Sequence, residues 1–177
     1  MKKKPFFLFT AILAIIEVIA TTGCSQNKDT LTWLEVISDI RNKYPDVKQL
    51  QTDELLSWMS NPPNKPIFLI DARAKEEFQI SHISGARNIP YNSRDPLKYL
   101  ANAKADNPIV VYCSVGYRSS ILARKLQTLG FKEVQNLEGS IFKWANEGKP
   151  LVQGSTIVHK VHPYNAHWGS LLERKYH

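Results

Sequence analysis

Apolar residues along the chain follow two patterns, and their alternation predicts the fold class. Residues 67–71 and 109–112 are short runs of apolar side chains bounded by turn-forming residues, as is typical of strands covered on both faces. Other segments place apolar residues at helical spacing. The patterns predict further strands at 87–90 and 134–137, and helices at 30–44, 52–59 (N-capped by Thr52), 75–80, 96–103, 119–129 (C-capped by Gly130) and 140–147.

Strands and helices that alternate with short connections predict an α/β domain with a parallel sheet and helices on both faces. In such a sheet, ligands bind beyond the carboxyl ends of the strands. Asp71 ends one predicted strand and Cys113 follows another, so we expect an acid, the nearby Arg73 and a thiol on one rim.

Cys113 is the strongest candidate for chemistry. It lies in a short loop between a predicted buried strand and a predicted helix. Loop amides and a helix N-terminus stabilise negative charge, so this layout favours a reactive thiolate. Burial as an inert core thiol is the structural alternative.

The first 23 residues predict an export signal. Three lysines precede an apolar run over 5–20, and Gly23-Cys24 then leads into a polar stretch. This arrangement resembles the lipobox of bacterial lipoproteins, with Cys24 as the lipidated first residue of the mature chain. We therefore expect an exported protein on the periplasmic or cell-envelope side, anchored in the membrane by lipid. Thr21 and Glu17 depart from the usual pattern, so an uncleaved membrane anchor and ordinary cleavage stay open.

Composition indicates which class of ligand to expect and how many free thiols the chain has. The 177 residues, 43% of them hydrophobic, suffice for one domain, and the formal charge is +7. Basic residues are scattered without a nucleic-acid motif, so small anions are the expected ligands. With Cys24 lipidated, Cys113 is the only free thiol and has no resolving cysteine in the chain.

Several motifs, in order, resemble the rhodanese (thiosulfate sulfurtransferase) homology domain. They are Asp71-Ala72-Arg73 with Glu76-Glu77-Phe78, Ser81-His82-Ile83-Ser84-Gly85-Ala86 running into Asn88-Ile89-Pro90, Cys113-Ser114-Val115-Gly116-Tyr117-Arg118-Ser119, and Leu137-Glu138-Gly139-Ser140 with Trp144. The resemblance implies a three-layer sandwich with a central five-stranded parallel sheet. It also implies a domain over 46–152, preceded by a tether and helix over 24–45 and followed by an extension over 153–177. Ser140 replaces the usual second glycine of a pair, a change we expect to leave the chemistry untouched.

The resemblance implies that Cys113 takes sulfur from a small anionic donor such as thiosulfate and passes it from a persulfide to a thiol or cyanide, without a cofactor. The amides of residues 114–118, including those of Ser114, Val115 and Tyr117, would form an anion nest. Gly116 would let the loop curl. Arg118 would supply positive charge for the donor, and Ser119 a hydroxyl near the sulfur or a helix N-cap.

Two other functions stay open. A non-catalytic binding or sulfur-sensing module would use the same loop. A cysteine phosphatase or arsenate reductase is disfavoured, because only Ser114 to Tyr117 separate Cys113 from Arg118, whereas phosphatases have a longer loop.

Residues near the site also have structural interpretations. Asp71 and Arg73 are expected mainly as a salt bridge that holds the rim. His82 is expected as a hydrogen-bonded structural histidine. Arg87 either faces the anion or lies on a solvated strand edge. Tyr117 either shapes the access of the donor or only caps the pocket.

The C-terminal extension is rich in histidine and aromatic residues, including His159, His162, Tyr164, His167, Trp168 and His177. No acidic or thiol ligand is close by in sequence, so we expect no metal site. We expect instead an aromatic flap packed on the domain, with a short helix over 170–174.

Overall fold

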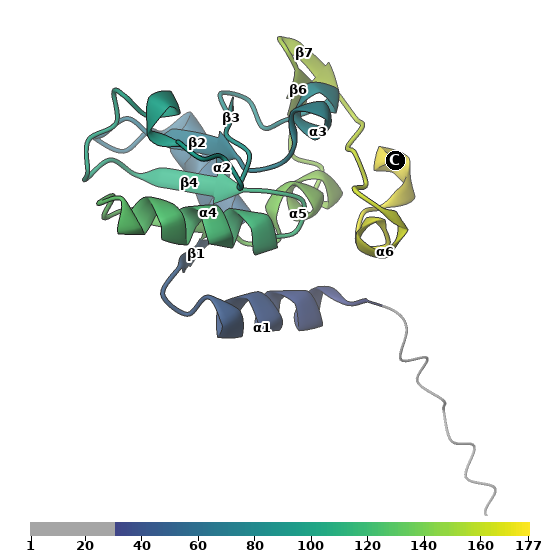
Figure 1. Cartoon of the computed structure of the whole chain (residues 1–177). Coiled ribbons are helices and arrows are strands. Elements are labelled where there is room, and N and C mark those ends of the chain that lie inside the picture. Colours follow the sequence, from purple (N-terminus) through teal and green to yellow (C-terminus); the bar gives the residue numbers. More distant parts are fainter. Residues whose placement is uncertain (1–30) are drawn as a thin grey trace, which may run out of the picture.

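The computed structural model describes residues 31–177. The predicted signal over 1–23, Cys24 and most of the tether lie outside the described residues. A parallel sheet in the order β1-β5-β4-β2-β3 forms the centre of the domain (Figure 1). Its strands are β1 (Lys48–Leu50), β2 (Phe68–Asp71), β3 (Arg87–Asn88), β4 (Ile109–Tyr112) and β5 (Val134–Leu137). The predicted five-stranded parallel sheet is therefore present.

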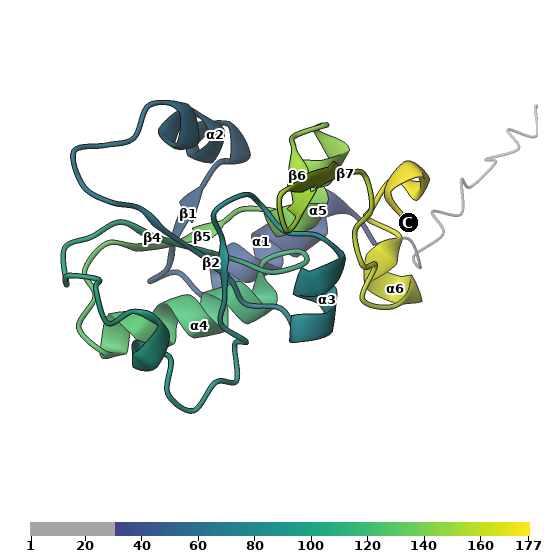
Figure 2. The same cartoon turned by 90° about the horizontal axis from the view of Figure 1, so that it is seen from above.

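Helices cover both faces of this sheet, as predicted. Figure 2 shows α2 and α5 on one side of the strands and α4 on the other. The helices are α1 (Trp33–Lys43), α2 (Thr52–Ser60), α3 (Lys75–Ile80), α4 (Tyr117–Thr128), α5 (Ser140–Asn146) and α6 (Ala166–Gly169). Every residue of β2 and β4 is buried, which explains why these two strands show continuous apolar runs in the sequence.

Several details of the predicted elements differ from the structure. The helix expected over 96–103 is a single 3-10 turn, Leu97–Tyr99, whose Leu97 and Tyr99 are exposed and bury no helical face. β1 was not predicted from the pattern, because only Leu50 of its three residues is buried. The cap of α2 is Gln51. The hydroxyl of Thr52, the predicted cap, donates instead to Glu147.

The α4 helix begins two residues earlier than predicted. Its first residue is Tyr117, and Gly116 takes the N-cap position that was one of two expectations for Ser119. Gly130 follows the C-cap residue Leu129 and has a φ of +100°. The helix therefore starts within the loop that carries Cys113 rather than after it.

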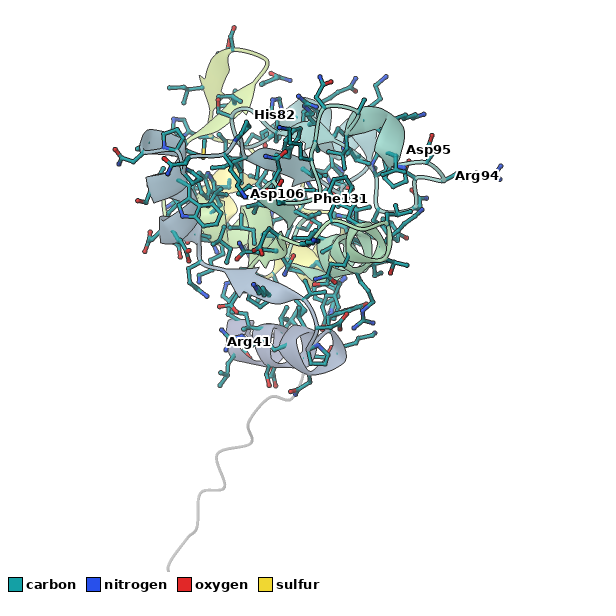
Figure 3. All side chains as sticks on the ribbon, turned by 90° about the vertical axis from the view of Figure 1, so that its left-hand side faces the viewer. Arg41, His82, Arg94, Asp95, Asp106 and Phe131 are labelled. Atoms are coloured by element: carbon teal, nitrogen blue, oxygen red, sulfur yellow. The ribbon has the colours of Figure 1, made fainter. Side chains whose placement is uncertain are left out.

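α1 packs beside α4 and against the loop that follows β4. Thr32 and Glu35 form a capping box at its start. Its Val36 and Ile40 are buried in the core. Arg41, labelled on α1 in Figure 3, pairs with the carboxylate of Glu138 at 2.6 Å. This pair ties α1 to the turn between β5 and α5.

The C-terminal extension packs on the domain. Its apolar residues Val161, Leu171, Leu172 and Tyr176 are buried in the core. The hairpin of β6 (Leu151–Gln153) and β7 (Thr156–Val158) leads into it, and α6 follows. The short helix expected over 170–174 is wrong: α6 lies earlier, capped by Asn165, and a 3-10 turn, Arg174–Tyr176, lies later. Among residues 31–177, no helix has the length and apolarity needed to cross a membrane.

Candidate active site

Cys113 lies at the carboxyl end of β4 and is almost fully buried, with 1% of the residue exposed. The backbone N–H of Gly116 donates to its Sγ at 3.1 Å. Gly116 is also the N-cap of α4, so the sulfur lies at the N-terminal end of a helix of 12 residues. Amide donation and the helix dipole both favour negative charge on that sulfur.

The hydroxyl of Ser119 lies 3.4 Å from the same sulfur, in agreement with its other predicted position. One hydroxyl proton has three acceptors here, since Ser119 Oγ is also 3.1 Å from the carbonyl oxygen of Gly116 and 2.5 Å from Oδ1 of Asn136. The Asn136 amide in turn donates to Gln49 at 2.7 Å. Gly116 N–H is therefore the donor most firmly committed to the sulfur, and Ser119 holds the loop to β5.

Gly116 is required by both its backbone and its surroundings. Its φ is +128°, a conformation that side chains disfavour. A Cβ there would lie 2.8 Å from Cδ1 of Ile40 and 3.3 Å from Nδ2 of Asn136. The glycine thus allows α1 and β5 to close directly on the loop.

Ser140 touches the start of the same loop, which sequence reasoning did not suggest. Its Oγ accepts a hydrogen bond from the backbone N–H of Cys113 at 3.0 Å and donates to the carbonyl oxygen of Leu137 at 3.1 Å. The residue has a φ of +52°. A glycine would fit this conformation more easily but could not satisfy the buried amide of Cys113.

Arg118 is held by Glu77, which sequence reasoning did not assign to the site. The guanidinium donates to both oxygens of the Glu77 carboxylate, at 2.6 and 2.8 Å, and to Ser114 Oγ at 2.9 Å. Burial raises the pKa of Glu77, but the hydrogen bonds to its carboxylate and the charge of Arg118 together lower this pKa by more. The net shift is therefore downward. Burial lowers the pKa of Arg118 and Glu77 raises it, with a net upward shift. Glu77 therefore neutralises the positive charge of Arg118, the side chain predicted from the sequence to attract the anionic donor.

Asp71 and Arg73 form the predicted salt bridge, with Arg73 Nη2 at 2.7 Å from Asp71 Oδ2 and both side chains fully buried. Arg73 Nη2 also donates to the carbonyl oxygen of Ser81 at 2.6 Å. Neither residue lines the pocket over Cys113. The pair lies at the predicted rim of the sheet, where it joins the end of β2 to the residue that follows α3 and does not face the pocket.

His82 and Arg87 are also outside this pocket. The His82 ring stacks on Phe78 with 3.9 Å between centroids, and its Nδ1 lies 3.1 Å from the carbonyl oxygen of Phe78. These contacts fit the predicted structural role. Arg87 is exposed and donates to the carbonyl oxygen of Tyr99 at 3.1 Å.

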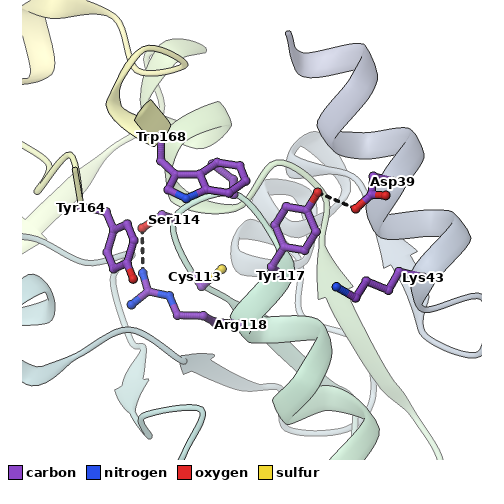
Figure 4. A pocket seen from close by; sticks show the side chains of 9 residues that line it. Asp39, Lys43, Cys113, Ser114, Tyr117, Arg118, Tyr164 and Trp168 are labelled. Atoms are coloured by element: carbon purple, nitrogen blue, oxygen red, sulfur yellow. Dashed lines mark hydrogen bonds between the residues drawn. The ribbon is translucent and has the colours of Figure 1, made fainter. Parts of the chain in front are cut away.

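Cys113 opens onto a pocket of about 390 Å³. The loop and the start of α4 line its base, α1 lines one side and the C-terminal extension another (Figure 4). The lining residues are Asp39, Lys43, Cys113, Ser114, Val115, Tyr117, Arg118, Tyr164 and Trp168. Within residues 31–177 there is no group of three side chains suited to hold a metal ion.

Two aromatic contacts connect the walls of the pocket to its base. The Tyr117 and Trp168 rings lie 5.4 Å apart, and the Arg118 guanidinium lies 4.6 Å from the Tyr164 ring. The Tyr117 hydroxyl donates to Oδ2 of Asp39 at 2.7 Å. Burial and this hydrogen bond raise the pKa of Tyr117, so the phenol stays protonated. Tyr117 therefore lines the pocket over Cys113.

This arrangement of strand, cysteine loop and helix agrees with a comparison against protein families. The family model described as the rhodanese-like domain matches residues 51–147. The chain belongs to the rhodanese family. The match ends before Tyr164 and begins after Lys43, so both walls of the pocket lie outside it.

Two curated relatives match about half of this chain. YqhL of Bacillus subtilis, an uncharacterized protein, is 40% identical over 82 residues, covering 46% of this chain and 63% of YqhL. The probable adenylyltransferase/sulfurtransferase MoeZ of Mycobacterium tuberculosis is 33% identical over 97 residues, covering 55% of this chain and 24% of MoeZ. The chain thus spans about a quarter of MoeZ and less than two thirds of YqhL.

Solved structures agree on the fold. A rhodanese-related protein from Thermoplasma volcanium has a TM-score of 0.51 at 25% identity, covering 60% of this chain and 98% of that protein. The BH2092 protein from Bacillus halodurans has a TM-score of 0.59 at 22% identity, covering 76% of this chain and 98% of the other. The thiosulfate sulfurtransferase from Pseudomonas aeruginosa has a TM-score of 0.55 at 20% identity, covering 70% of this chain and 23% of the other.

Proposed function

We propose that this rhodanese transfers sulfane sulfur through a persulfide on Cys113, with thiosulfate or a related anion as donor and a thiol or cyanide as acceptor. The observation that carries the proposal is the position of Cys113 Sγ. It accepts the N–H of Gly116 at 3.1 Å, at the N-terminus of α4, and lines a pocket. A thiolate is the nucleophile that sulfur transfer requires.

In the loading step, the Cys113 thiolate attacks the outer sulfur of thiosulfate. A bond forms between Sγ and that sulfur, the bond to the sulfonate sulfur breaks with its electron pair, and sulfite leaves. The outer sulfur then carries the negative charge. The amides of the loop and the N-terminus of α4 favour an anion before and after this step.

In the discharge step, an acceptor thiolate attacks the outer sulfur of the protonated persulfide. A new sulfur–sulfur bond forms, the bond to Sγ breaks, and the Cys113 thiolate is restored. No oxidant or cofactor is consumed, because the acceptor leaves as a persulfide. Since Cys113 is the only cysteine among residues 31–177, no second thiol in that part of the chain can resolve the persulfide.

Intact-mass spectrometry after incubation with thiosulfate tests the proposal. We expect the mass to rise by one sulfur atom in the wild type and in Cys24→Ala, and to stay constant in Cys113→Ser. Cyanide should then remove the added sulfur and release thiocyanate. Loading without discharge would indicate a sulfur-sensing module, and an unchanged wild-type mass would reject the transfer chemistry.

We also propose that the protein is exported and anchored in the membrane through a lipid on Cys24. The support is the Gly23-Cys24 step after the apolar run, which resembles a lipobox. A radiolabelled fatty acid should label the wild type and leave Cys24→Ala unlabelled. Equal labelling of the two proteins would refute the lipid anchor.

A further inference from the structure

The pocket over Cys113 combines a base from the rhodanese domain with walls that lie outside it. The family match covers residues 51–147. Asp39 and Lys43 come from α1, before that match, and Tyr164 and Trp168 come after it. Residues outside the family match are therefore in a position to contact a substrate at Cys113 and to influence which substrate binds.

The two cationic side chains of the pocket, Arg118 and Lys43, differ in whether an anionic partner neutralises them. Arg118 is bound by both carboxylate oxygens of Glu77 and by Ser114, and the Tyr164 ring lies 4.6 Å from its guanidinium. Lys43 is exposed, and its Nζ lies 5.9 Å from the Tyr117 ring centroid. Among the described residues, Lys43 forms no salt bridge. Lys43 is thus the pocket cation whose charge is available to a ligand.

Lys43 is separated from the sulfur by an aromatic ring. In Figure 4 the Tyr117 side chain lies between Cys113 and Lys43. The sulfonate of thiosulfate is bonded directly to the sulfur that is transferred, so a bound thiosulfate keeps its charge close to Cys113. A ligand that reaches Lys43 while its sulfur meets Cys113 needs a carbon chain between the two groups.

The aromatic rings that line the pocket suit such a carbon chain. The Tyr117 and Trp168 rings adjoin each other at 5.4 Å, and the volume of about 390 Å³ exceeds what an inorganic thiosulfate ion needs. Aromatic walls with a few placed polar groups are typical of sites for small organic ligands. Tyr164 adopts a φ of +64°, which costs energy for a residue with a side chain. The residue with this costly backbone conformation, Tyr164, is one of the two residues through which the C-terminal extension lines the pocket.

We infer that the sulfur acceptor is a small organic thiol that carries a carboxylate, with its carbon chain against Tyr117 and Trp168 and its carboxylate at Lys43. The inference rests on the proposed function, since the acceptor discharges the Cys113 persulfide by the step already written. Asp39 is the other exposed charge of the pocket, and it accepts the Tyr117 hydroxyl at 2.7 Å. Without Lys43, its negative charge would repel the carboxylate.

The test compares acceptors of equal length and different charge in a single turnover. Cys113 is first loaded to completion with thiosulfate, as shown by intact mass. Discharge rates are then measured with mercaptohexanoate, mercaptohexanol and aminohexanethiol in the wild type and in Lys43→Met. Taking the ratio of the two proteins for each thiol removes the intrinsic reactivity of that thiol.

Loss of Lys43 should slow discharge by mercaptohexanoate by about 2- to 5-fold, the range expected for one exposed, partly screened charge pair. Mercaptohexanol should change less than about twofold, and aminohexanethiol should react faster, because Asp39 is then unopposed. Lys98→Met is the matched control. Lys98 also lies beside a tyrosine ring, at 4.8 Å from Tyr99, but does not line this pocket, so all three rates should stay constant.

The outcomes separate the two proposals. If Cys113 does not take up sulfur, the proposed function fails. If it loads but all three thiols slow equally in Lys43→Met, or none does, the assignment of the acceptor is wrong while sulfur transfer stands. A faster reaction with mercaptohexanoate in Lys43→Met would also overturn the assignment.

Discussion

The base and the walls of the pocket differ in how they are built. In the base, Cys113 interacts with Gly116 and Ser119, which lie within six residues of it in sequence. The walls meet this base across long distances in sequence: Asp39 of α1 accepts the Tyr117 hydroxyl across 78 positions, and Trp168 of the C-terminal extension packs beside the Tyr117 ring. The donors to the Cys113 sulfur are thus encoded locally, whereas access to it depends on segments brought together by folding.

Gly116 is where the base and the α1 wall meet, and a methyl group there should have the largest effect. Gly116→Ala combines a disfavoured φ of +128° with contacts at 2.8 Å to Ile40 and 3.3 Å to Asn136. We expect a loss of about 2–4 kcal/mol in the free energy of unfolding. We also expect sulfur loading at least about tenfold slower, because the donor to Sγ shifts. Chemical denaturation and mass-resolved loading measure both.

Gly130→Ala is the matched control for Gly116→Ala. Gly130 also has a positive φ, +100°, but a Cβ there meets nothing within 4 Å. The control should lose only about 1 kcal/mol and keep its loading rate, because it has the backbone penalty without the crowding. Equal losses in the two variants would show that α1 does not press on the loop.

Substitution of Glu77 tests whether this carboxylate neutralises Arg118 in the base of the pocket. Glu77→Gln should lower the free energy of unfolding at neutral pH by about 1–3 kcal/mol, because Arg118 loses its ionic partner at a site only 16% exposed. Arg118 would then be free to attract the anionic donor. Thiosulfate loading should therefore be about 2- to 5-fold faster.

The difference between wild type and Glu77→Gln should depend on pH. The pKa of Glu77 is lowered in the folded protein from its ordinary 4.5, so its stabilising effect is complete above that value. The effect is lost as the pH falls through the lowered pKa, and the two unfolding curves should converge in acid. Glu76→Gln, an exposed neighbour, should track the wild type at all pH values. A constant gap between Glu77→Gln and the wild type across the acid range would contradict the ion-pair assignment.

The smallest effect is expected in the α1 wall. Thr32→Ala removes the side chain that caps this helix and should cost about 1 kcal/mol. Hydrogen exchange should rise in the first turn of α1 and stay constant in α4. Ser38→Ala, at an exposed position of the same helix, should leave the exchange unchanged. Faster exchange in α4 of Thr32→Ala would mean that wall and base unfold together.

Much of the fold could be predicted because its signals are local. The fully buried strands β2 and β4 are continuous apolar runs, and the cysteine loop lies between β4 and α4 in sequence. The 3-10 turn at Leu97–Tyr99 and the edge strand β1 were missed for a physical reason. Each buries few side chains, so tertiary contacts rather than periodicity decide their conformation.

The sequence by itself determined four of the five strands of the sheet, the cysteine loop and the glycine that the loop requires. Short-range sterics and the alternation of apolar positions are enough to specify these features. Only the tertiary structure decided that Glu77 neutralises Arg118, that Ser140 holds the Cys113 amide, and that Lys43 and Trp168 face one pocket. These contacts join residues distant in sequence, and no local pattern records which distant partner a side chain will meet.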